Sequence, residues 1–162
     1  MNDIFAKLAG GKTFSKIDLS QAYSQTPVEE KSLKYLTVNT HRGLFKVTRL
    51  PFGISSAPGI FQRLMDCVVS DIPGAACHLD DIVITGVNES VHVATIRKML
   101  ERLRDAGLKV KRAKCSFIWP KITYLGHDID ATGIHPTEEK IRASKEAPIS
   151  EISLNFELSL EL

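Results

Sequence analysis

The sequence predicts a mixed α/β domain in which strands and helices are interleaved and pack in layers. Stretches with alternating or continuous apolar residues, typical of strands, alternate along the chain with stretches whose apolar residues recur at helical spacing. No internal repeat or low-complexity segment is visible. The composition, 43% hydrophobic and 25% charged over 162 residues, is that of one ordinary globular domain with a single core.

Four short strands are expected outside the most informative segment, which is treated below. Thr13 to Asp18 alternates between polar and apolar residues and predicts the first strand. Residues 36–40 and 45–50 predict two strands joined through His41-Arg42-Gly43, with glycine in the turn. Residues 122–129 predict a further strand.

Three helices are expected over residues 56–72, 88–107 and 136–147. In the first, Pro58 is tolerated in the opening turn, and Pro73-Gly74 ends the helix. In the second, the apolar stripe is expected to face inward and the arginines outward. The expected inward residues of that helix are Val93, Ile96, Leu100 and Leu103. The expected N-terminal capping residues are Ser56, Asn88 and Thr137.

Composition also bears on location and on covalent cross-links. No apolar run is long enough to span a bilayer, and residues 1–10 lack the basic-then-apolar order of a secretory signal, so an intracellular product without membrane contact is expected. Whether it lies in the cytoplasm or the nucleus stays open. Cys67, Cys77 and Cys115 are odd in number and lack metal-ligand spacing, so we expect buried free thiols.

Positive charge is concentrated in one stretch although the formal net charge is only +2. Residues 97–114 contain eight basic and two acidic residues, a local excess of six positive charges. Such a stretch can face phosphates, but it is more often a solvated surface.

The segment from Ala75 to Gly86 is the most informative, because Asp80 and Asp81 interrupt what otherwise resembles a buried hairpin. A solvated polar turn is one interpretation. The turn lacks the glycine or asparagine that tight turns favour, however, and both flanks are apolar. Two adjacent carboxylates repel each other, and a divalent cation with oxygen ligands such as Mg²⁺ would offset that repulsion. Asp18, at the end of its own strand, is a candidate third carboxylate.

Four motifs in a fixed order then resemble the reverse transcriptases of long-terminal-repeat retrotransposons of the Ty3/Gypsy kind. They are FSKIDLSQAY at 14–23, LPFGISSAPGIFQ at 50–62, HLDD at 78–81 and YLGH at 124–127. The resemblance covers residues 4–147. It implies an α+β fold, the reverse-transcriptase palm, with an antiparallel sheet, helices packed on one face and part of the fingers. Residues 1–147 would be a partial domain that reaches the start of the thumb, and residues 148–162 a tail that does not align.

In that family three aspartates hold two Mg²⁺ ions, for which Mn²⁺ is a possible substitute, and the resemblance gives this catalytic and metal-binding role to Asp18, Asp80 and Asp81. One ion would activate the primer 3′-hydroxyl and the other would steady the triphosphate. The implied partners are deoxynucleoside triphosphates and an RNA or DNA template with its primer. The missing fingers, thumb or ribonuclease H portions of a longer polyprotein are further implied partners.

The resemblance also implies residues that surround the reaction. The implied nucleotide-binding residues are Tyr23, which would disfavour a 2′-hydroxyl, Phe52, Gly53 and Gln62. The implied primer or template contacts are His78, Leu125 and Gly126. Without the resemblance, Tyr23 reads as a half-buried strand aromatic and Phe52-Gly53 as a plain turn. His41, His92 and His135 match no ligand arrangement and are expected at the surface.

The chain departs from the family pattern in three ways. His78 stands where the family has a tyrosine, and an imidazole offers less contact surface to the primer–template. The fingers segment that precedes this region in the family is lacking, and the tail does not align. We therefore expect an exposed sheet edge that pairs with other chains, and an isolated chain that is unstable and nearly inactive.

Three functions compete at this point. The first is an RNA-directed DNA polymerase domain, the second a non-catalytic nucleic-acid-binding remnant of a decayed retroelement that uses residues 97–114. The third, a carboxylate–metal nuclease, does not account for the motifs at 14–23 and 124–127.

Overall fold

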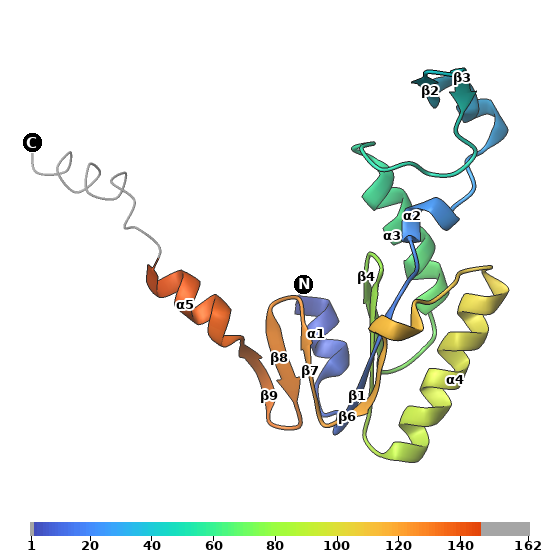
Figure 1. Ribbon diagram of the computed structural model, residues 1–162. Helices are drawn as coiled ribbons and strands as arrows, with labels where there is room; N and C mark the ends of the chain where they lie inside the picture. Colours follow the sequence, from blue (N-terminus) through green and yellow to red (C-terminus); the bar gives the residue numbers. More distant parts are fainter. Residues whose placement is uncertain (1, 147–162) are drawn as a thin grey trace, which may run out of the picture.

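A computed structural model describes residues 2–146 and shows an α+β architecture built on antiparallel sheets (Figure 1). This confirms the predicted fold class. The helices are α1 (Asn2–Leu8), α2 (Ala22–Gln25), α3 (Ala57–Val69), α4 (Glu89–Asp105) and α5 (Glu138–Glu146), with 3-10 turns at Glu30–Tyr35 and Arg112–Lys114. The strands are β1 (Thr13–Asp18), β2 (Thr37–Thr40), β3 (Gly43–Lys46), β4 (Ala75–His78), β5 (Asp81–Gly86), β6 (Ser116–Trp119), β7 (Lys121–Tyr124), β8 (His127–Asp130) and β9 (Gly133–Pro136). The tail at 148–162 lies outside the described residues.

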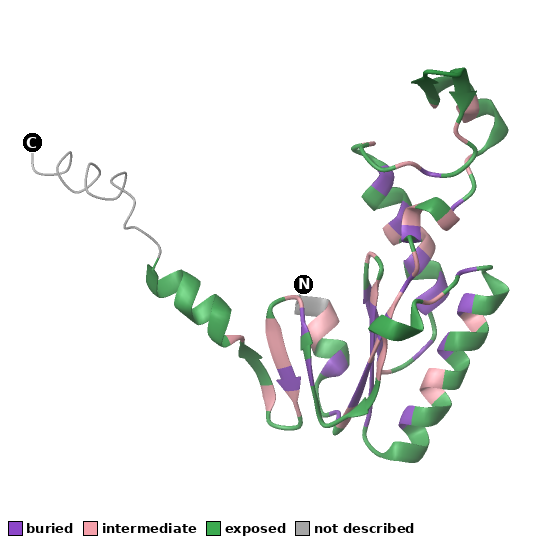
Figure 2. Ribbon diagram, viewed as in Figure 1, coloured by how far each residue is buried: buried purple, intermediate pink, exposed green. Residues whose placement is uncertain are grey.

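A four-stranded antiparallel sheet in the order β4-β5-β1-β6 forms the centre of the molecule. Side chains alternate between its two faces, and each face has its own hydrophobic core. On β1, Ile17 belongs to the core beneath α3 and α4, whereas Phe14 belongs to the core on the opposite face. Figure 2 shows the buried residues gathered in this central sheet and in the sides of the helices that cover it.

Helices α3 and α4 cover one face of the sheet. On α3 the apolar stripe expected at Ile60, Phe61, Leu64, Met65 and Val68 is found in part: Phe61 and Met65 are fully buried, but Ile60 is 49% exposed. Ser56 makes no side-chain capping bond. On α4 the capping prediction is confirmed, since Asn88 Oδ1 accepts from Val91 N at 2.9 Å. The predicted inward stripe of α4 is partly wrong. Its buried residues are His92, Met99 and Leu103 with Ile96 beside them, whereas Val93 and Leu100 are exposed.

The burial of His92 corrects the expectation that it lies at the surface. The stripe of α4 that faces the sheet is shifted by one residue from the expected one, and this shift carries the imidazole inward. His41 and His135 are exposed as expected. The cysteine prediction is also partly wrong, because Cys77 is buried but Cys67 is exposed.

The second face of the sheet is covered by α1 and by the three-stranded sheet β7-β8-β9. Residues 122–129, expected as one strand, are instead two strands with a tight turn between them, and Leu125 (φ 49°) and Gly126 (φ 71°) are the turn residues. Positive φ at both central residues is typical of the hairpin turn whose twist matches its strands. The periodicity of residues 122–129 did not predict this turn.

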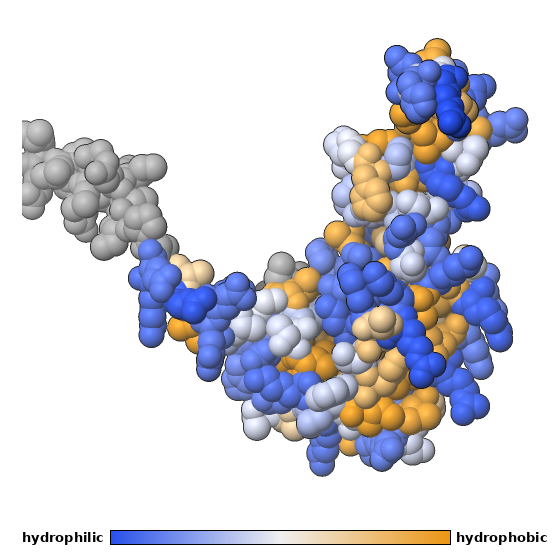
Figure 3. All heavy atoms as spheres, in the orientation of Figure 1, coloured by the Kyte–Doolittle hydropathy of each residue, from blue (hydrophilic) through white to orange (hydrophobic). Residues whose placement is uncertain are grey.

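The β2–β3 hairpin projects from the central sheet at the top of Figure 1. The hairpin was expected, but β3 ends at Lys46 rather than at residue 50. All eight of its strand residues are exposed, among them Leu44 at 73% and Phe45 at 52%. Figure 3 shows orange hydrophobic atoms among blue ones at this tip. A two-stranded hairpin with exposed apolar side chains is marginal alone and needs a further packing partner.

No helix within residues 2–146 combines the length and the apolar character that crossing a bilayer requires.

Candidate active site

Two of the three predicted carboxylates face each other across adjacent strands. Asp18 ends β1 and Asp81 begins β5, and the two are direct partners in the antiparallel register. Directly opposite residues project from the same side of a sheet with their Cβ atoms about 5 Å apart. The pair therefore presents two like charges at one end of the sheet.

Asp80 lies beside this pair in the two-residue connection between β4 and β5. The residue before it, Leu79, has φ 54°, a left-handed conformation that is uncommon for a leucine. The backbone carbonyl of Asp80 accepts from Leu19 N at 3.3 Å, which ties the connection to the end of β1. The fold thus gathers Asp18, Asp80 and Asp81 from two distant parts of the sequence.

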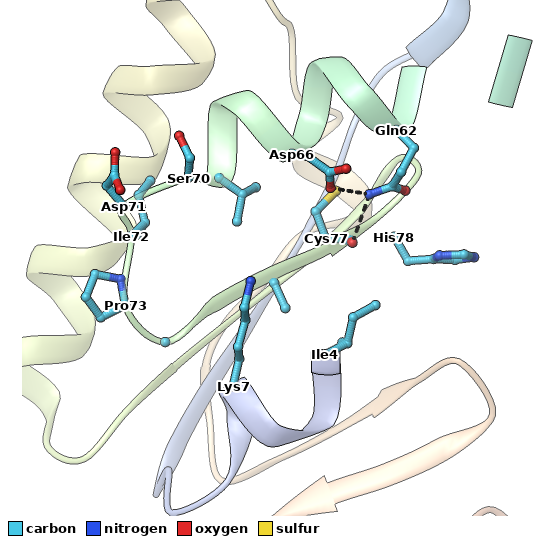
Figure 4. A pocket seen from close by; sticks show the side chains of 13 residues that line it. Ile4, Lys7, Gln62, Asp66, Ser70, Asp71, Ile72, Pro73, Cys77 and His78 are labelled. Carbon is cyan, nitrogen blue, oxygen red and sulfur yellow. Dashed lines mark hydrogen bonds between the residues drawn. The ribbon is translucent and has the colours of Figure 1, made fainter. Parts of the chain in front are cut away.

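The connection is held from below by α3. Gln62 Oε1 accepts from Leu79 N at 2.7 Å, and Gln62 Nε2 donates to Cys77 O at 3.3 Å and to Asp66 Oδ1 at 2.8 Å. Figure 4 shows Gln62 reaching from α3 toward Cys77. Burial, reinforced by the charge of Asp66, raises the pKa of the Cys77 thiol, so this cysteine stays protonated and is a packing residue.

The opposite side of the connection is held by the β7–β8 hairpin. Tyr124 Oη donates to the backbone carbonyl of Asp81 at 3.1 Å, and the tyrosine itself is fully buried. Burial raises the pKa of Tyr124, so its hydroxyl keeps the proton that it donates. Supports from α3 and from β7 leave the Asp80–Asp81 backbone little freedom.

Two lysines partly neutralise the carboxylates. Lys16 Nζ lies 3.1 Å from Asp81 Oδ1, and Lys114 Nζ lies 3.6 Å from Asp18 Oδ2. Lys114 belongs to the basic stretch at 97–114, whose role the sequence left open. The stretch is divided in the structure, because its first part is on the exposed side of α4 and its last part reaches the carboxylates.

A pocket of about 380 Å³ opens at the carboxylates. Asp18 and Asp80 line it together with Tyr23 and Phe52, two of the residues that the sequence resemblance assigned to nucleotide binding. The Tyr23 ring contacts Phe52 edge-to-face with the centroids 5.2 Å apart, and it meets the buried Phe61 at 5.3 Å in the same manner. Lys111 and Lys114 also line the pocket. Both lysines belong to the basic stretch that the sequence indicated could face phosphates, but neither was assigned to the site.

The other expected site residues lie outside this pocket. Gly53 is exposed with φ 89°, a conformation that suits glycine, and Leu125-Gly126 form the hairpin turn. Gln62 and His78 line a different and larger cavity of about 810 Å³, which lies between α1 and α3 beside β4 (Figure 4). The larger cavity contains none of the three aspartates, so we take the smaller pocket as the candidate site.

The donor set suits a hard cation only in part. Within residues 2–146 no group of three or more histidine, cysteine or acidic side chains is close enough to hold a metal ion. Asp18 and Asp80 nevertheless share the pocket wall, Asp18 and Asp81 are cross-strand partners, and all three offer carboxylate oxygens. These are the ligands that Mg²⁺ prefers.

Comparison with known proteins decides the family. Residues 2–129 match the family described as reverse transcriptase (RNA-dependent DNA polymerase). The chain belongs to the reverse transcriptase family. This membership confirms the resemblance to retrotransposon reverse transcriptases that the four motifs indicated.

Relatives of this reverse transcriptase chain include retrotransposon products. It is 38% identical over 154 residues to an uncharacterized protein of Caenorhabditis elegans, covering 94% of this chain and 12% of that protein. It is 32% identical over 151 residues to the retrovirus-related Pol polyprotein from transposon 297 of Drosophila melanogaster, covering 92% of this chain and 14% of that polyprotein. The chain therefore spans only about an eighth of the length of these relatives.

Solved structures of the foamy viral protease–reverse transcriptase share the fold. The complex with double-stranded DNA matches with a TM-score of 0.81 at 26% identity, covering 91% of this chain and 26% of the viral one. The complex with an RNA/DNA hybrid matches with a TM-score of 0.78 at 27% identity, covering 97% and 22%.

Proposed function

We propose that this chain is the palm of an RNA-directed DNA polymerase and contributes the carboxylates for nucleotidyl transfer from a deoxynucleoside triphosphate to a primer 3′-hydroxyl. One observation carries the proposal: Asp18 and Asp80 share a pocket with Tyr23 and Phe52, while Asp81 lies directly opposite Asp18. Carboxylates beside an aromatic-walled pocket suit a ligand that combines a flat base with phosphates.

In this proposal Asp18, Asp80 and Asp81 hold two Mg²⁺ ions, or Mn²⁺ in their place. When bound, such ions stabilise negative charge on the reacting phosphate and lower the pKa of the attacking hydroxyl. The chain's own residues set the geometry. Gln62 and Tyr124 fix the Asp80–Asp81 backbone, and Lys16 and Lys114 neutralise the carboxylates when no divalent ion does so.

The nucleotide would lie against the aromatic wall of the pocket. Tyr23, wedged between Phe52 and Phe61, cannot tilt away easily, so its ring can exclude a 2′-hydroxyl from the sugar site. Lys111 and Lys114 line the same pocket and can meet the triphosphate charge. Gly53 follows Phe52 in the same loop, and its backbone groups can contact the nucleotide. Gln62 acts on the nucleotide only indirectly, by holding the connection between β4 and β5 that carries Asp80.

The primer–template would lie over the same end of the palm. His78 is the cross-strand partner of Asp81, so it can meet the primer end beside the reaction. Leu125-Gly126 can hold the primer through backbone groups of the hairpin turn. The foamy viral structures are complexes with double-stranded DNA and with an RNA/DNA hybrid. We propose that this chain also binds both kinds of duplex.

Further parts of a longer polyprotein would complete the enzyme. The exposed β2–β3 hairpin is then the portion of the fingers that residues 1–147 contain, and its apolar side chains would pack against the rest of the fingers. The intracellular location stays a prediction, as does the division into a partial reverse transcriptase domain at 1–147 and an unaligned tail at 148–162.

Primer extension on an RNA template tests the proposal. The chain is compared with Asp80→Asn/Asp81→Asn and with His78→Tyr, each alone and fused to a fingers segment of the family. We expect Mg²⁺-dependent extension from the fused chain, at least about 10³-fold less from the aspartate variant, and more extension after His78→Tyr. Equal extension by the aspartate variant would refute the assigned site.

A second candidate function is nucleic-acid binding without catalysis. It is favoured by the lysine pairing of the carboxylates and by the exposed basic side of α4. Binding that falls steeply with salt, without nucleotide addition in any fused form, would support this alternative.

A further inference from the structure

Trp119, the single tryptophan of the chain, is exposed at the edge of the palm. It ends β6, the outer strand of the central sheet, and 57% of its surface is accessible. Phe117 and Ile118 precede it and are 38% and 45% exposed. Hydrophobic atoms reach the surface around β6 and the adjoining side of α4 in the lower part of Figure 3. Three consecutive exposed apolar residues in one strand indicate a binding surface.

A β-bulge determines which way Trp119 faces. Ser116 pairs with Lys16 and Trp119 pairs with Phe14, so β6 has one residue more than β1 between these pairs. The extra residue is accommodated at Ile118, whose φ is 58°. Opposite residues project from the same side of a sheet, so the indole lies on the face that also carries Lys16 and Asp18. Bulges occur beside active sites, where they redirect a side chain.

Buried polar groups hold this bulge in place. Ile118 N donates to Ser15 Oγ at 3.0 Å, and Ser15 Oγ lies 2.7 Å from Nε2 of the fully buried His92. Gly86 provides the room for this histidine, because a Cβ at that position would lie 2.6 Å from His92 Cβ. Catalysis uses none of these groups, so their evident role is to fix the strand that presents Trp119.

The indole is one wall of a small pocket of about 210 Å³ that Lys16, Lys121 and Thr123 also line. Lys16 links this pocket to the active site through its contact with Asp81. Lys121 is half exposed at the rim. An exposed aromatic ring beside ammonium groups is the usual composition of a site for single-stranded nucleic acid, in which bases stack on the ring and the cations meet the backbone.

We infer that Trp119 is a stacking platform for a base of the nucleic-acid strand that leads away from the reacting end, an assignment that rests on the proposed function. Trp119 is opposite Phe14, four residues from Asp18, which corresponds to about 13 Å along the sheet. Four stacked nucleotides span that length. The contact is tolerant of sequence, because every base offers a flat face.

Fluorescence of Trp119 tests the inference directly, because no other tryptophan contributes. The 162-residue chain is titrated with an oligothymidylate, without Mg²⁺ or nucleotide. We expect quenching that saturates with binding. By anisotropy of a labelled oligothymidylate, Trp119→Ala should bind about 5- to 100-fold more weakly and Trp119→Phe should retain most of the affinity. Tyr35→Ala is the matched control, because it removes an aromatic ring that is 76% exposed and lies outside strand β6, and it should bind normally.

An abasic oligonucleotide of the same length separates stacking from phosphate contact. Trp119→Ala should weaken binding of this probe little, because it offers no base. The inference is overturned if the chain does not bind oligothymidylate, or if Trp119→Ala binds it as tightly as the parent. It is overturned as well if Trp119→Ala lowers the affinity for oligothymidylate and for the abasic oligonucleotide by the same factor. It is also overturned if Trp119→Ala alters only self-association in light scattering, which would indicate a protein contact. A Trp119→Ala variant that binds oligothymidylate like the parent and also extends primers normally would overturn this inference but leave the proposed function intact.

Discussion

Asp18 and Asp81 lie directly opposite each other on neighbouring antiparallel strands, so two like charges share one face of the palm. Like charges in this arrangement destabilise a sheet unless a positive group compensates them. Lys16 and Lys114 supply that group at 3.1 and 3.6 Å. If the carboxylates bind divalent ions as proposed, stability and metal binding are coupled at this site.

Lys16→Met should change both the stability of the metal-free chain and its affinity for divalent ions. Without the ammonium near Asp81 the metal-free chain should lose less than about 1 kcal/mol, because both partners are partly exposed. Divalent ions should bind more tightly, because no built-in cation competes with them. Urea unfolding in a chelator and a Mn²⁺ titration measure the two effects. Lys31→Met, which breaks an exposed pair with Glu29, is the control and should change neither.

Gln62→Ala should loosen the connection that carries Asp80 and Asp81. The change leaves Leu79 N without its acceptor, which should cost about 1–3 kcal/mol of unfolding free energy in urea denaturation. Gln62→Glu keeps an acceptor for Leu79 N, but it removes the donor to Asp66 and Cys77 and sets a second carboxylate beside Asp66, so it should also destabilise the chain. If Gln62→Ala unfolds at the same urea concentration as the parent, the hydrogen bond to Leu79 N contributes nothing to the free energy of unfolding.

Gly86→Ala should destabilise the fold by about 1–3 kcal/mol, because the new Cβ would lie 2.6 Å from His92 Cβ and force α4 to shift. Gly59→Ala is the matched control. Gly59 is in α3 with open space around its Cβ position, so alanine there should stabilise the helix by about 0.5–1 kcal/mol. Thermal or urea unfolding of both variants measures the contrast, and equal effects would contradict the close packing of His92.

Acid should weaken the fold through His92. Burial lowers the pKa of His92 below its ordinary value of 6.5, so below that pH the unfolded chain binds a proton that the folded chain does not. Stability should therefore be full above about pH 7 and fall as the pH drops from 6.5 toward the lowered folded-state pKa. His92→Gln should remove this dependence between pH 7 and 5. A parent chain whose melting temperature is constant across that window would contradict the prediction.

The sequence predicted which residues share the pocket better than it predicted the residues that surround them. Asp18, Asp80, Tyr23 and Phe52 were grouped by motif order, and the fold brings all four to one pocket. Lys111 and Lys114 were missed, because a basic stretch does not reveal which of its members turns back toward a strand end. Backbone contacts between residues far apart in sequence fix that return, among them the bonds from Lys111 N to Asp18 O and from Ser20 N to Lys109 O.

Local patterns failed where tertiary packing decides. The burial of His92 depends on Gly86, at the end of β5, and on Ser15, 77 residues away in the sequence. Because these contacts lie outside α4, the periodicity of the helix alone pointed to Val93 and Leu100 instead. The strand expected at 122–129 is a hairpin because a leucine adopts positive φ at its turn, which propensity disfavours. Strands β6 and β9 are four residues each, too short for a periodicity to register.

Binding of Mn²⁺, followed by electron paramagnetic resonance with primer–template and nucleotide present, tests the central claim most directly, because it reports on the carboxylates whether or not the chain turns over. The parent and Asp66→Asn, a change at a carboxylate that accepts from Gln62 Nε2 on α3, should bind Mn²⁺ alike. Asp18→Asn, Asp80→Asn and Asp81→Asn should each weaken binding by at least about tenfold. Unchanged Mn²⁺ binding in all three variants would contradict the assignment of these aspartates as metal ligands.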